Sequence, residues 1–256
     1  MRHLFGDILK FSNFQKMKKL AFLSLALLMT LSSCYIDGWN ESISGNGRVV
    51  EESRDVSGFT GVHISSGIDV YLSEGNSFDV RVEADENLQE VILTEKEGNM
   101  LVVKTDRVNI RNARSKKVHV SLPELGELKI SSAGDCVGQT LFNCEDLRLS
   151  ISSAGDLSLE VDAEEIHLDI SSSGDARISG STEILDVSLS SAGELDAFDL
   201  IAARVNVVVS SAGDARVFAT EEISMNASSA GNIYYKGDAR VSHSHSSSAG
   251  SIVKKN

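Results

Sequence analysis

A five-residue segment, Ser-Ser-Ala-Gly-Asp or a close variant, recurs seven times in the C-terminal half of the chain. The glycines of the seven copies are separated by 21, 19, 19, 20, 18 and 19 residues. Apolar residues alternate around each copy, as at Leu147, Leu149 and Ile151 before Gly155, which is typical of strands with one buried face. Such a repeat predicts a solenoid, because each unit can bury its apolar face only against its neighbours.

The length of the repeat narrows the choice of fold. It is too short for a β-α-β unit, which needs about 30 residues or more, and it contains no segment with helical periodicity. We therefore predict an all-β fold, a parallel, right-handed β-helix with coils of about 19–20 residues. A two-sheet roll or an antiparallel meander of hairpins is the alternative, because Ala-Gly-Asp could form a hairpin turn. The segments between copies, such as Asp162-Ala163-Glu164-Glu165, lack Gly or Asn pairs, which disfavours the meander.

If the alternation continues through the repeated segment, its second Ser and its Gly point inward. The first Ser, the Ala and the Asp then point outward. We expect the Gly to supply a backbone angle that residues with a Cβ reach at a cost. We expect the inward Ser to hydrogen-bond along the stack. The residues with these predicted structural roles are Gly134, Gly155, Gly174, Gly193, Gly213, Gly231 and Gly250, with Ser132, Ser153, Ser172, Ser191, Ser211, Ser229 and Ser248.

The outward acidic positions form the candidate binding site. This ladder consists of Asp135, Asp156, Asp175, Glu194, Asp214 and Asn232. Two unit charges on neighbouring strands, ~4.8 Å apart, repel by about 1 kcal/mol in water and by less in salt. The ladder is therefore tolerable without a cation. Calcium-binding rolls have a shorter repeat that is richer in Gly and Asp, so we predict no metal site and no cofactor.

Other chemistry-bearing residues are scattered. His243 and His245 share a strand face without a third ligand, so we expect an exposed edge, and His63, His119 and His167 look like isolated surface residues. The basic run from Lys104 to Lys117 is expected to be a solvated loop, with a phosphate or polyanion contact as the alternative. The sequence contains no nucleophile motif, phosphate-binding loop or HExxH pair. Pectin-active β-helices cluster Asp with Arg and Lys, whereas the acids of this ladder have no basic partners among them, so we predict no enzymatic activity.

The N-terminus has the pattern of an export signal. Lys16, Lys18 and Lys19 precede an apolar stretch, Leu20 to Leu31, which is too short to span a bilayer but suits a signal peptide. The stretch ends in Leu31-Ser32-Ser33-Cys34, which resembles the bacterial lipobox. We predict a signal peptide over residues 1–33, acylation of Cys34 and a tether over residues 34–46.

Three further features bear on the environment. Met17 is the natural start of such a signal peptide, so residues 1–16 are interpreted as a misassigned start. The formal net charge of −13 argues against nucleic acid as a partner. An oxidising envelope would permit a disulfide between Cys136 and Cys144, with two buried thiols as the alternative.

Residues 47–126 show the same alternation without the regular period, so we predict an irregular β lobe there and the regular solenoid over 127–256. Ser65-Ser66-Gly67 looks like a degenerate copy of the repeat. The segments Arg54–Val62, Gly67–Gly75 and Val82–Leu88, followed by the repeats, resemble the family called "putative auto-transporter adhesin, head GIN domain", common in lipoproteins of Bacteroidetes. The resemblance covers roughly residues 48–235. It implies an all-β, β-helix-like fold and brings no catalytic residues.

We therefore predict a non-enzymatic lipoprotein of the cell envelope, anchored to the outer membrane through Cys34. Its solenoid surface would bind a glycan or a host or cell-surface protein. A structural or stress-response protein without a dedicated ligand is the alternative, and a polysaccharide-active enzyme is the third. Ser242, Ser244 and Ser246 replace apolar residues in the last coil. Such a polar cap discourages end-to-end stacking, so we predict a monomer.

Overall fold

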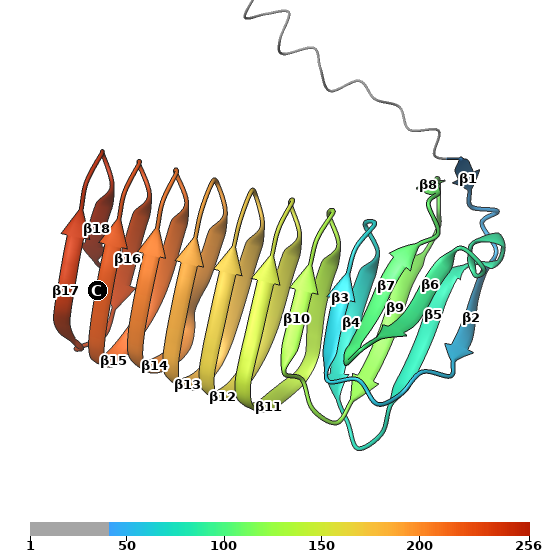
Figure 1. Cartoon of the computed structure of the whole chain (residues 1–256), viewed down its shortest axis with the longest axis horizontal. Coiled ribbons are helices and arrows are strands. Elements are labelled where there is room, and N and C mark those ends of the chain that lie inside the picture. Colours follow the sequence, from blue (N-terminus) through green and yellow to red (C-terminus); the bar gives the residue numbers. More distant parts are fainter. Residues whose placement is uncertain (1–40) are drawn as a thin grey trace, which may run out of the picture. The chain divides into compact units, whose positions relative to one another are not determined.

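The structure is a computed structural model that describes residues 41–256 (Figure 1). Its main feature is parallel pairing between the strands of successive coils. The predictions on the signal peptide, on Met17 and on Cys34 lie outside these residues. The regular part contains β10 (Glu127–Ile130), β11 (Asp135–Ile151), β12 (Asp156–Ile170), β13 (Asp175–Leu189), β14 (Glu194–Val209), β15 (Asp214–Ala227), β16 (Asn232–Lys236), β17 (Arg240–Ser246) and β18 (Ser251–Lys254). All of their pairings with one another are parallel. The predicted β-solenoid is thus confirmed, and the antiparallel meander is excluded.

Each long strand from β11 to β15 takes part in two sheets. The first half of β11 pairs with β4, whereas its last residues pair with β10. Likewise the first half of β15 pairs with β16 and its second half with β17. Each coil therefore consists of two strand segments joined by a bend on one side and a tight turn on the other (Figure 1). We call the sheet of first halves sheet 1 and the sheet of second halves sheet 2.

The N-terminal lobe continues both sheets, but in a different order from the chain. β3 (Gly61–Ile64) pairs with β10, and β4 (Asp69–Glu74) pairs with β11. On their other side, β3 pairs with β7 (Met100–Thr105) and β4 with β9 (Lys116–Leu122), again in parallel. The β3–β4 coil therefore lies between the regular coils and a coil that comes later in the sequence.

Antiparallel strands end the stack at this side. β5 (Asp79–Asp85) pairs with β9 and with β2 (Val49–Arg54), and β6 (Ile92–Glu97) pairs with β7. One turn of 3-10 helix, Glu86–Leu88, follows β5. A separate parallel pair joins β1 (Ser42–Ser44) to β8 (Asn109–Arg111). The last residues of the segment expected to be a tether are thus part of the folded unit.

The core is one continuous cluster of aliphatic side chains between the two sheets. Leu149, Leu168, Val187 and Val207 occupy the same register position on successive strands, and each is at most 2% exposed. The alternation of apolar residues in the sequence therefore identified the inward face of every regular coil. Phe59 and Phe142 are the largest side chains in this core.

The repeated segment differs from its predicted orientation at the second Ser. This residue is exposed in every copy, not inward, because it is the second residue of a tight turn and has a left-handed backbone. In the copy at Ser152, for example, Ser153 has φ 56° and Ala154 has φ 63°. In several copies the Gly N–H closes the turn on the carbonyl of the first Ser, as from Gly231 to Ser228 at 2.9 Å. Two successive residues with positive φ are typical of a type I′ turn.

The recurring glycines also have a different role from the one predicted. None of the seven has a positive φ, so they do not supply the unusual backbone angle. They lie where a side chain would collide with the preceding coil. A Cβ on Gly155 would lie 2.6 Å from Cγ2 of Ile130, and one on Gly193 would lie 2.6 Å from Cγ2 of Ile170. The glycine therefore allows the turn of one coil to pack closely over the core of the coil before it.

The degenerate copy in the N-terminal lobe stacks on the first regular copy. Ser66 and Gly67 have φ values of 63° and 62°, as expected for the turn positions. The N–H of Gly67 donates to the carbonyl of Ser132 at 2.9 Å, and Asp69 lies opposite Asp135. The turn and its stacking thus continue across a gap of more than sixty residues in the sequence.

The last coil is polar, as predicted. All residues of β17 are exposed, and Ser244 and Ser246 lie opposite the buried Met225 and Ala227. Ser242 differs from its predicted position because a bulge shifts the register there. His243 and His245 lie on this exposed edge strand, with ring centroids 6.5 Å apart.

The two cysteines of the described part are free thiols. Cys136 is buried between the sheets and Cys144 is half-buried at the bend of β11. Burial raises the pKa of both thiols, that of Cys144 to about 12. Over residues 41–256, no helix is both long and apolar enough to cross a bilayer.

Candidate binding surfaces

The acidic ladder is assembled on the outer face of sheet 1, next to the tight turns. Asp135, Asp156, Asp175, Glu194, Asp214 and Asn232 lie opposite one another on successive strands. The first four are exposed and the last two are half-buried. Asp69 extends the row into the N-terminal lobe, and Ser251 continues it on β18. A shallow hollow of ≈ 450 Å³ runs along the middle of this row.

Hydrogen bonds join neighbouring members of the ladder, and one ion pair joins the ladder to a basic residue beside it. The backbone N–H of Glu194 donates to Oδ1 of Asp175 at 3.1 Å, and Nδ2 of Asn232 donates to Oδ1 of Asp214 at 2.7 Å. Arg216 forms an ion pair with Glu194. The expectation that the ladder has no basic partner is therefore wrong. Arg216 lies two residues beyond the ladder position of β15, so it faces the same side and reaches diagonally across to β14.

The pKa values of two ladder carboxyls, Asp135 and Asp175, are raised by their surroundings. Burial raises the pKa of Asp135 above its ordinary value, and the negative charges of Asp156 and Asp69 raise it further, whereas Lys116 opposes them. Burial also raises the pKa of Asp175, together with the charges of Asp156 and Glu194. These directions are expected when carboxylates are stacked one per strand. The repulsion that Asp135 and Asp175 receive from their acidic neighbours is therefore only partly relieved, by Lys116 and by the backbone N–H of Glu194.

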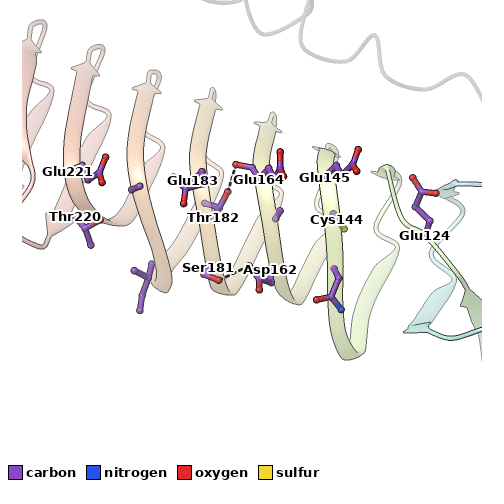
Figure 2. Close-up of a pocket in the computed structure, with 14 residues that line it drawn as sticks. Glu124, Cys144, Glu145, Asp162, Glu164, Ser181, Thr182, Glu183, Thr220 and Glu221 are labelled. Carbon is purple, nitrogen blue, oxygen red and sulfur yellow. Dashed lines mark hydrogen bonds between the residues drawn. The ribbon is translucent and has the colours of Figure 1, made fainter.

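A second acidic surface lies where the long strands bend, and sequence reasoning missed it. Figure 2 shows Glu124, Glu145, Glu164, Glu183 and Glu221 following one another along this bend. They line a groove of ≈ 980 Å³ together with Asp162, Ser181 and Thr182. Ser181 donates to Asp162 at 2.8 Å and Thr182 to the carbonyl of Glu164 at 3.3 Å. The acidic segments between the repeats had been interpreted only as connections without turn signals. Their recurrence at a fixed offset was the signal for this surface.

His167 is not isolated, contrary to the prediction. Its Nε2 lies 3.1 Å from Oε1 of Glu165, and its Nδ1 lies 3.6 Å from Oδ2 of Asp186 on the next strand. Within the described residues this is the one group of three side chains that could hold a metal ion. The two carboxylates face opposite nitrogens of the ring, however. This arrangement suits ion pairing with an imidazolium better than convergence on one ion.

The basic run is distributed over strands and a connection, so it is not simply a solvated loop. Lys104 on β7 pairs with Glu95 at 3.1 Å and with Glu97 at 3.0 Å. Lys116 on β9 donates to the carbonyl of Gly67, and Lys117 lies 3.9 Å from Glu83. Arg111 lies on β8. The three lysines of the run are therefore engaged within the N-terminal lobe, whereas its three arginines, Arg107, Arg111 and Arg114, are exposed.

The geometry defines a class of protein, a two-sheet parallel β-solenoid that is closed at one end by antiparallel strands and carries acidic rows on its outer faces. Within that class the chain belongs to the family "putative auto-transporter adhesin, head GIN domain", whose model matches residues 58–239. The resemblance inferred from the sequence is thus confirmed.

Solved structures show the same fold. A putative adhesin from Bacteroides fragilis is 20% identical, with a TM-score of 0.77, and one from Parabacteroides merdae is 19% identical, with a TM-score of 0.68. A protein from Parabacteroides distasonis, named as a putative lipid binding protein, is 22% identical with a TM-score of 0.70. Each comparison covers 84% of this chain and all of the other chain. No curated protein matches the sequence.

Proposed function

We propose that this protein is a non-enzymatic lipoprotein of the cell envelope that presents its solenoid as a binding or adhesion surface. The observation that carries the proposal is the in-register row of Asp, Glu and Asn side chains on the outer face of sheet 1, of which the first four are exposed. The names of the similar structures, putative adhesins in two cases, agree with a binding role. The partner would be a glycan or a protein of a host or neighbouring cell, and nucleic acid is disfavoured by the net charge of −13.

The construction of the coil supports a binding role. Strands on both sides hold each ladder residue, and the tight turn next to the row is closed by backbone hydrogen bonds. Side chains held in this way lose little conformational entropy on binding, which favours affinity. A ligand with hydroxyl groups spaced along a chain could donate to successive carboxylates. Charge-assisted hydrogen bonds of this kind are about twice as strong as neutral ones.

Two arguments favour a non-enzymatic role. The ladder repeats one carboxylate per coil, and the two members whose pKa values are shifted, Asp135 and Asp175, are shifted in the same direction. General acid–base catalysis instead needs a pair of groups whose environments push their pKa values apart. The single Glu165–His167–Asp186 group lies on sheet 2, away from the ladder, and has the geometry of an ion pair.

The proposed anchor is the lipid on Cys34, which would hold a monomer on the outer membrane. Its test is metabolic labelling with a radioactive fatty acid in the native host, with the Cys34→Ala variant as the control. We expect label and membrane association in the native protein and neither in the variant. Proteolysis of intact cells would then show whether the solenoid faces outward. An unlabelled protein released as a soluble form would contradict the anchor.

The binding role is tested with the purified protein on a glycan array and on whole bacterial and host cells. We expect binding that weakens in the double variant Asp156→Asn and Asp175→Asn, because both exposed carboxylates lose their charge. The matched control is Glu164→Gln with Glu183→Gln on the bend, which removes the same charge elsewhere. Absence of binding to every surface, with an intact fold, would favour the structural or stress-response alternative. Turnover of any polysaccharide would favour the enzyme.

A further inference from the structure

The C-terminal end of sheet 1 carries a hollow of different chemistry from the ladder. It has a volume of ≈ 480 Å³ and is lined by Phe198, Arg216, Tyr234, Lys236, Lys255 and Asn256. Phe198 lies in a bulge of β14, Arg216 on β15 and Tyr234 opposite Arg216 on β16. Three of the six lining residues are therefore cationic, in a chain whose net charge is −13.

Aromatic rings hold these cations in place. Nζ of Lys236 lies 4.6 Å from the ring centroid of Phe198, and Nζ of Lys255 lies 4.7 Å from that of Tyr234. The guanidinium carbon of Arg216 lies 5.8 Å from the same Tyr234 ring. Distances within about 6 Å of a centroid are favourable for cation–π attraction. Flexible side chains that would otherwise sample many rotamers are thus brought together over one small area.

The side chains of Lys236 and Lys255 form no ion pair or hydrogen bond with the other described residues. The six other lysines of the folded part do, because four of them pair with an acid while Lys96 and Lys116 donate to the carbonyls of Gly98 and Gly67. Lys104, Lys117, Lys129 and Lys254 each lie within 4.0 Å of an acid, whereas no ion pair of the described residues includes Lys236 or Lys255. Arg216 is paired with Glu194. Two ammonium groups without a counter-ion, fixed by rings in a hollow, make a site for an anionic group of a ligand.

We propose that this hollow, defined by Phe198, Tyr234, Lys236 and Lys255, binds the carboxylate of an acidic saccharide whose hydroxyl groups reach the adjacent ladder. The inference rests on the proposed binding function and names its ligand class. Lys236 and Lys255 would pair with the sugar carboxylate. Glu194, Asp214 and Asn232, on the same face and the same strands as the lining residues, would accept hydrogen bonds from the sugar hydroxyls.

The ladder is also the reason to favour a saccharide over other anions. A phosphate polymer or an anionic membrane would place further negative charges along sheet 1, where they would face a row of carboxylates and be repelled. A saccharide with one uronic acid among neutral rings carries a single carboxylate and otherwise presents hydroxyl donors. That pattern is complementary to a cationic hollow beside a row of acceptors.

The test measures, by titration calorimetry at low salt, the affinity of the purified protein for a galactotriose whose non-reducing terminal ring is oxidised to galacturonate, the monouronate. Neutral galactotriose, inorganic phosphate and phosphatidylglycerol vesicles are the comparison probes. We expect binding of the monouronate that is at least tenfold tighter than that of galactotriose. The double variant Lys236→Gln and Lys255→Gln should weaken it at least tenfold. Lys254→Gln, the neighbouring lysine paired with Asp238 at 3.7 Å, should change it less than twofold.

Two further variants separate the parts of the proposal. Phe198→Leu should weaken binding severalfold, because Lys236 loses the ring that holds it. Asp214→Asn should weaken binding of the monouronate, because an acceptor for the hydroxyl groups of its neutral rings loses its charge. Unchanged unfolding midpoints, expected for these partly exposed positions, show that the fold is intact.

Three outcomes overturn the inference. They are equal binding by the double lysine variant, equal affinity for galactotriose, and binding only to phosphate or to the vesicles. If the double variant still binds cells or the glycan array like the native protein, the proposed binding function survives while this site does not. If neither the native protein nor any variant binds any surface or probe, both fail.

Discussion

A Cβ placed on Gly174 would lie 2.6 Å from Cγ2 of Ile151, which belongs to the preceding coil. The same relationship recurs between Gly155 and Ile130 and between Gly193 and Ile170. Contacts this short do not occur between real carbon atoms, so any side chain at these positions must displace a buried isoleucine. The glycine and the isoleucine are therefore one packing unit that sets how closely a turn can lie over the core.

The first prediction follows from this contact. Gly174→Ala should lower the free energy of unfolding by about 1–3 kcal/mol, the usual cost of forcing extra volume into a packed core. Urea denaturation followed by circular dichroism measures the change. Ser173→Ala is the matched control, because this neighbour is exposed and all six other copies carry Ala there. A Gly174→Ala variant as stable as the control would show that the coil spacing relaxes easily.

The second prediction concerns the adjacent turn position. Ala154 is exposed and has φ 63°. A left-handed backbone costs a residue with a Cβ about 1–2 kcal/mol, whereas Gly loses about 0.5–1 kcal/mol more conformational entropy than Ala on folding. Ala154→Gly should therefore raise the free energy of unfolding by up to about 1 kcal/mol.

The opposite substitution at the same site completes this test. Ala154→Val should lower the free energy of unfolding by about 1–2 kcal/mol, because a β-branched residue is strained at positive φ. Ser158→Val, at an exposed strand position of β12, is the control and should be neutral or slightly stabilising. The same urea titrations provide the measurement. Equal tolerance of Gly and Val at position 154 would contradict the assigned turn.

These two sites also show why the sequence predicted the coil but not its turn. Ile151 before the turn and Leu157 after it are separated by an even number of positions. The apolar alternation therefore has the same phase on both sides of the turn, and it located the buried face correctly. Two successive left-handed residues reverse the chain direction and leave that alternation in phase. A straight strand and a tight turn therefore have the same apolar pattern. The glycine was predicted to have the unusual backbone angle, whereas the residues before it have that angle.

The pairing of strands that are distant in the sequence could not be predicted from local sequence patterns. The β3–β4 coil pairs with strands that begin at Met100 and Lys116 on one side and at Glu127 and Asp135 on the other. Nothing in a strand's own residues specifies which distant strand it pairs with.

The cationic hollow was missed for a related reason. Phe198 and Lys236 meet only because a bulge in β14 shifts the register between them.

The third prediction concerns repulsion within the ladder. The pKa of Asp135 is raised in the folded state by burial and by the charges of Asp156 and Asp69. A raised carboxyl pKa destabilises the fold at neutral pH, and the penalty disappears as the pH falls through the folded pKa toward the ordinary value. Asp135→Asn should therefore stabilise the protein at pH 7, by up to about 1 kcal/mol at low ionic strength.

Salt and pH distinguish this effect from a local packing change. The gain of Asp135→Asn should shrink in 1 M salt, where the screening length is about 3 Å, and at pH values near 4. Thermal unfolding of both proteins across this range is the measurement. Asp106→Asn, an exposed acid in the loop after β7, is the control and should be nearly neutral. A gain that is independent of both salt and pH would rule out charge repulsion as its cause.

The last prediction concerns Asp85, a buried carboxylate in the N-terminal lobe. Burial alone would raise its pKa. The backbone N–H groups of Gly47, Ser115 and Arg114 nevertheless donate to it at 2.7, 3.1 and 2.9 Å, and together they hold the pKa below its ordinary value. Asp85 thus joins the ends of three separate segments. Its removal leaves buried donors without an acceptor, so Asp85→Ala should cost about 3 kcal/mol.

The stability that the Asp85 carboxylate contributes depends on pH. A depressed carboxyl pKa contributes stability that is fully present above the ordinary Asp value and is lost as the pH falls through the folded pKa. The difference in unfolding free energy between the native protein and Asp85→Asn should therefore be largest near pH 7 and shrink below about pH 4. Urea titrations at several pH values measure it, with the exposed Asp79→Asn on the same strand as the control. A constant difference across the range would mean that Asp85 acts through its shape and not through its charge.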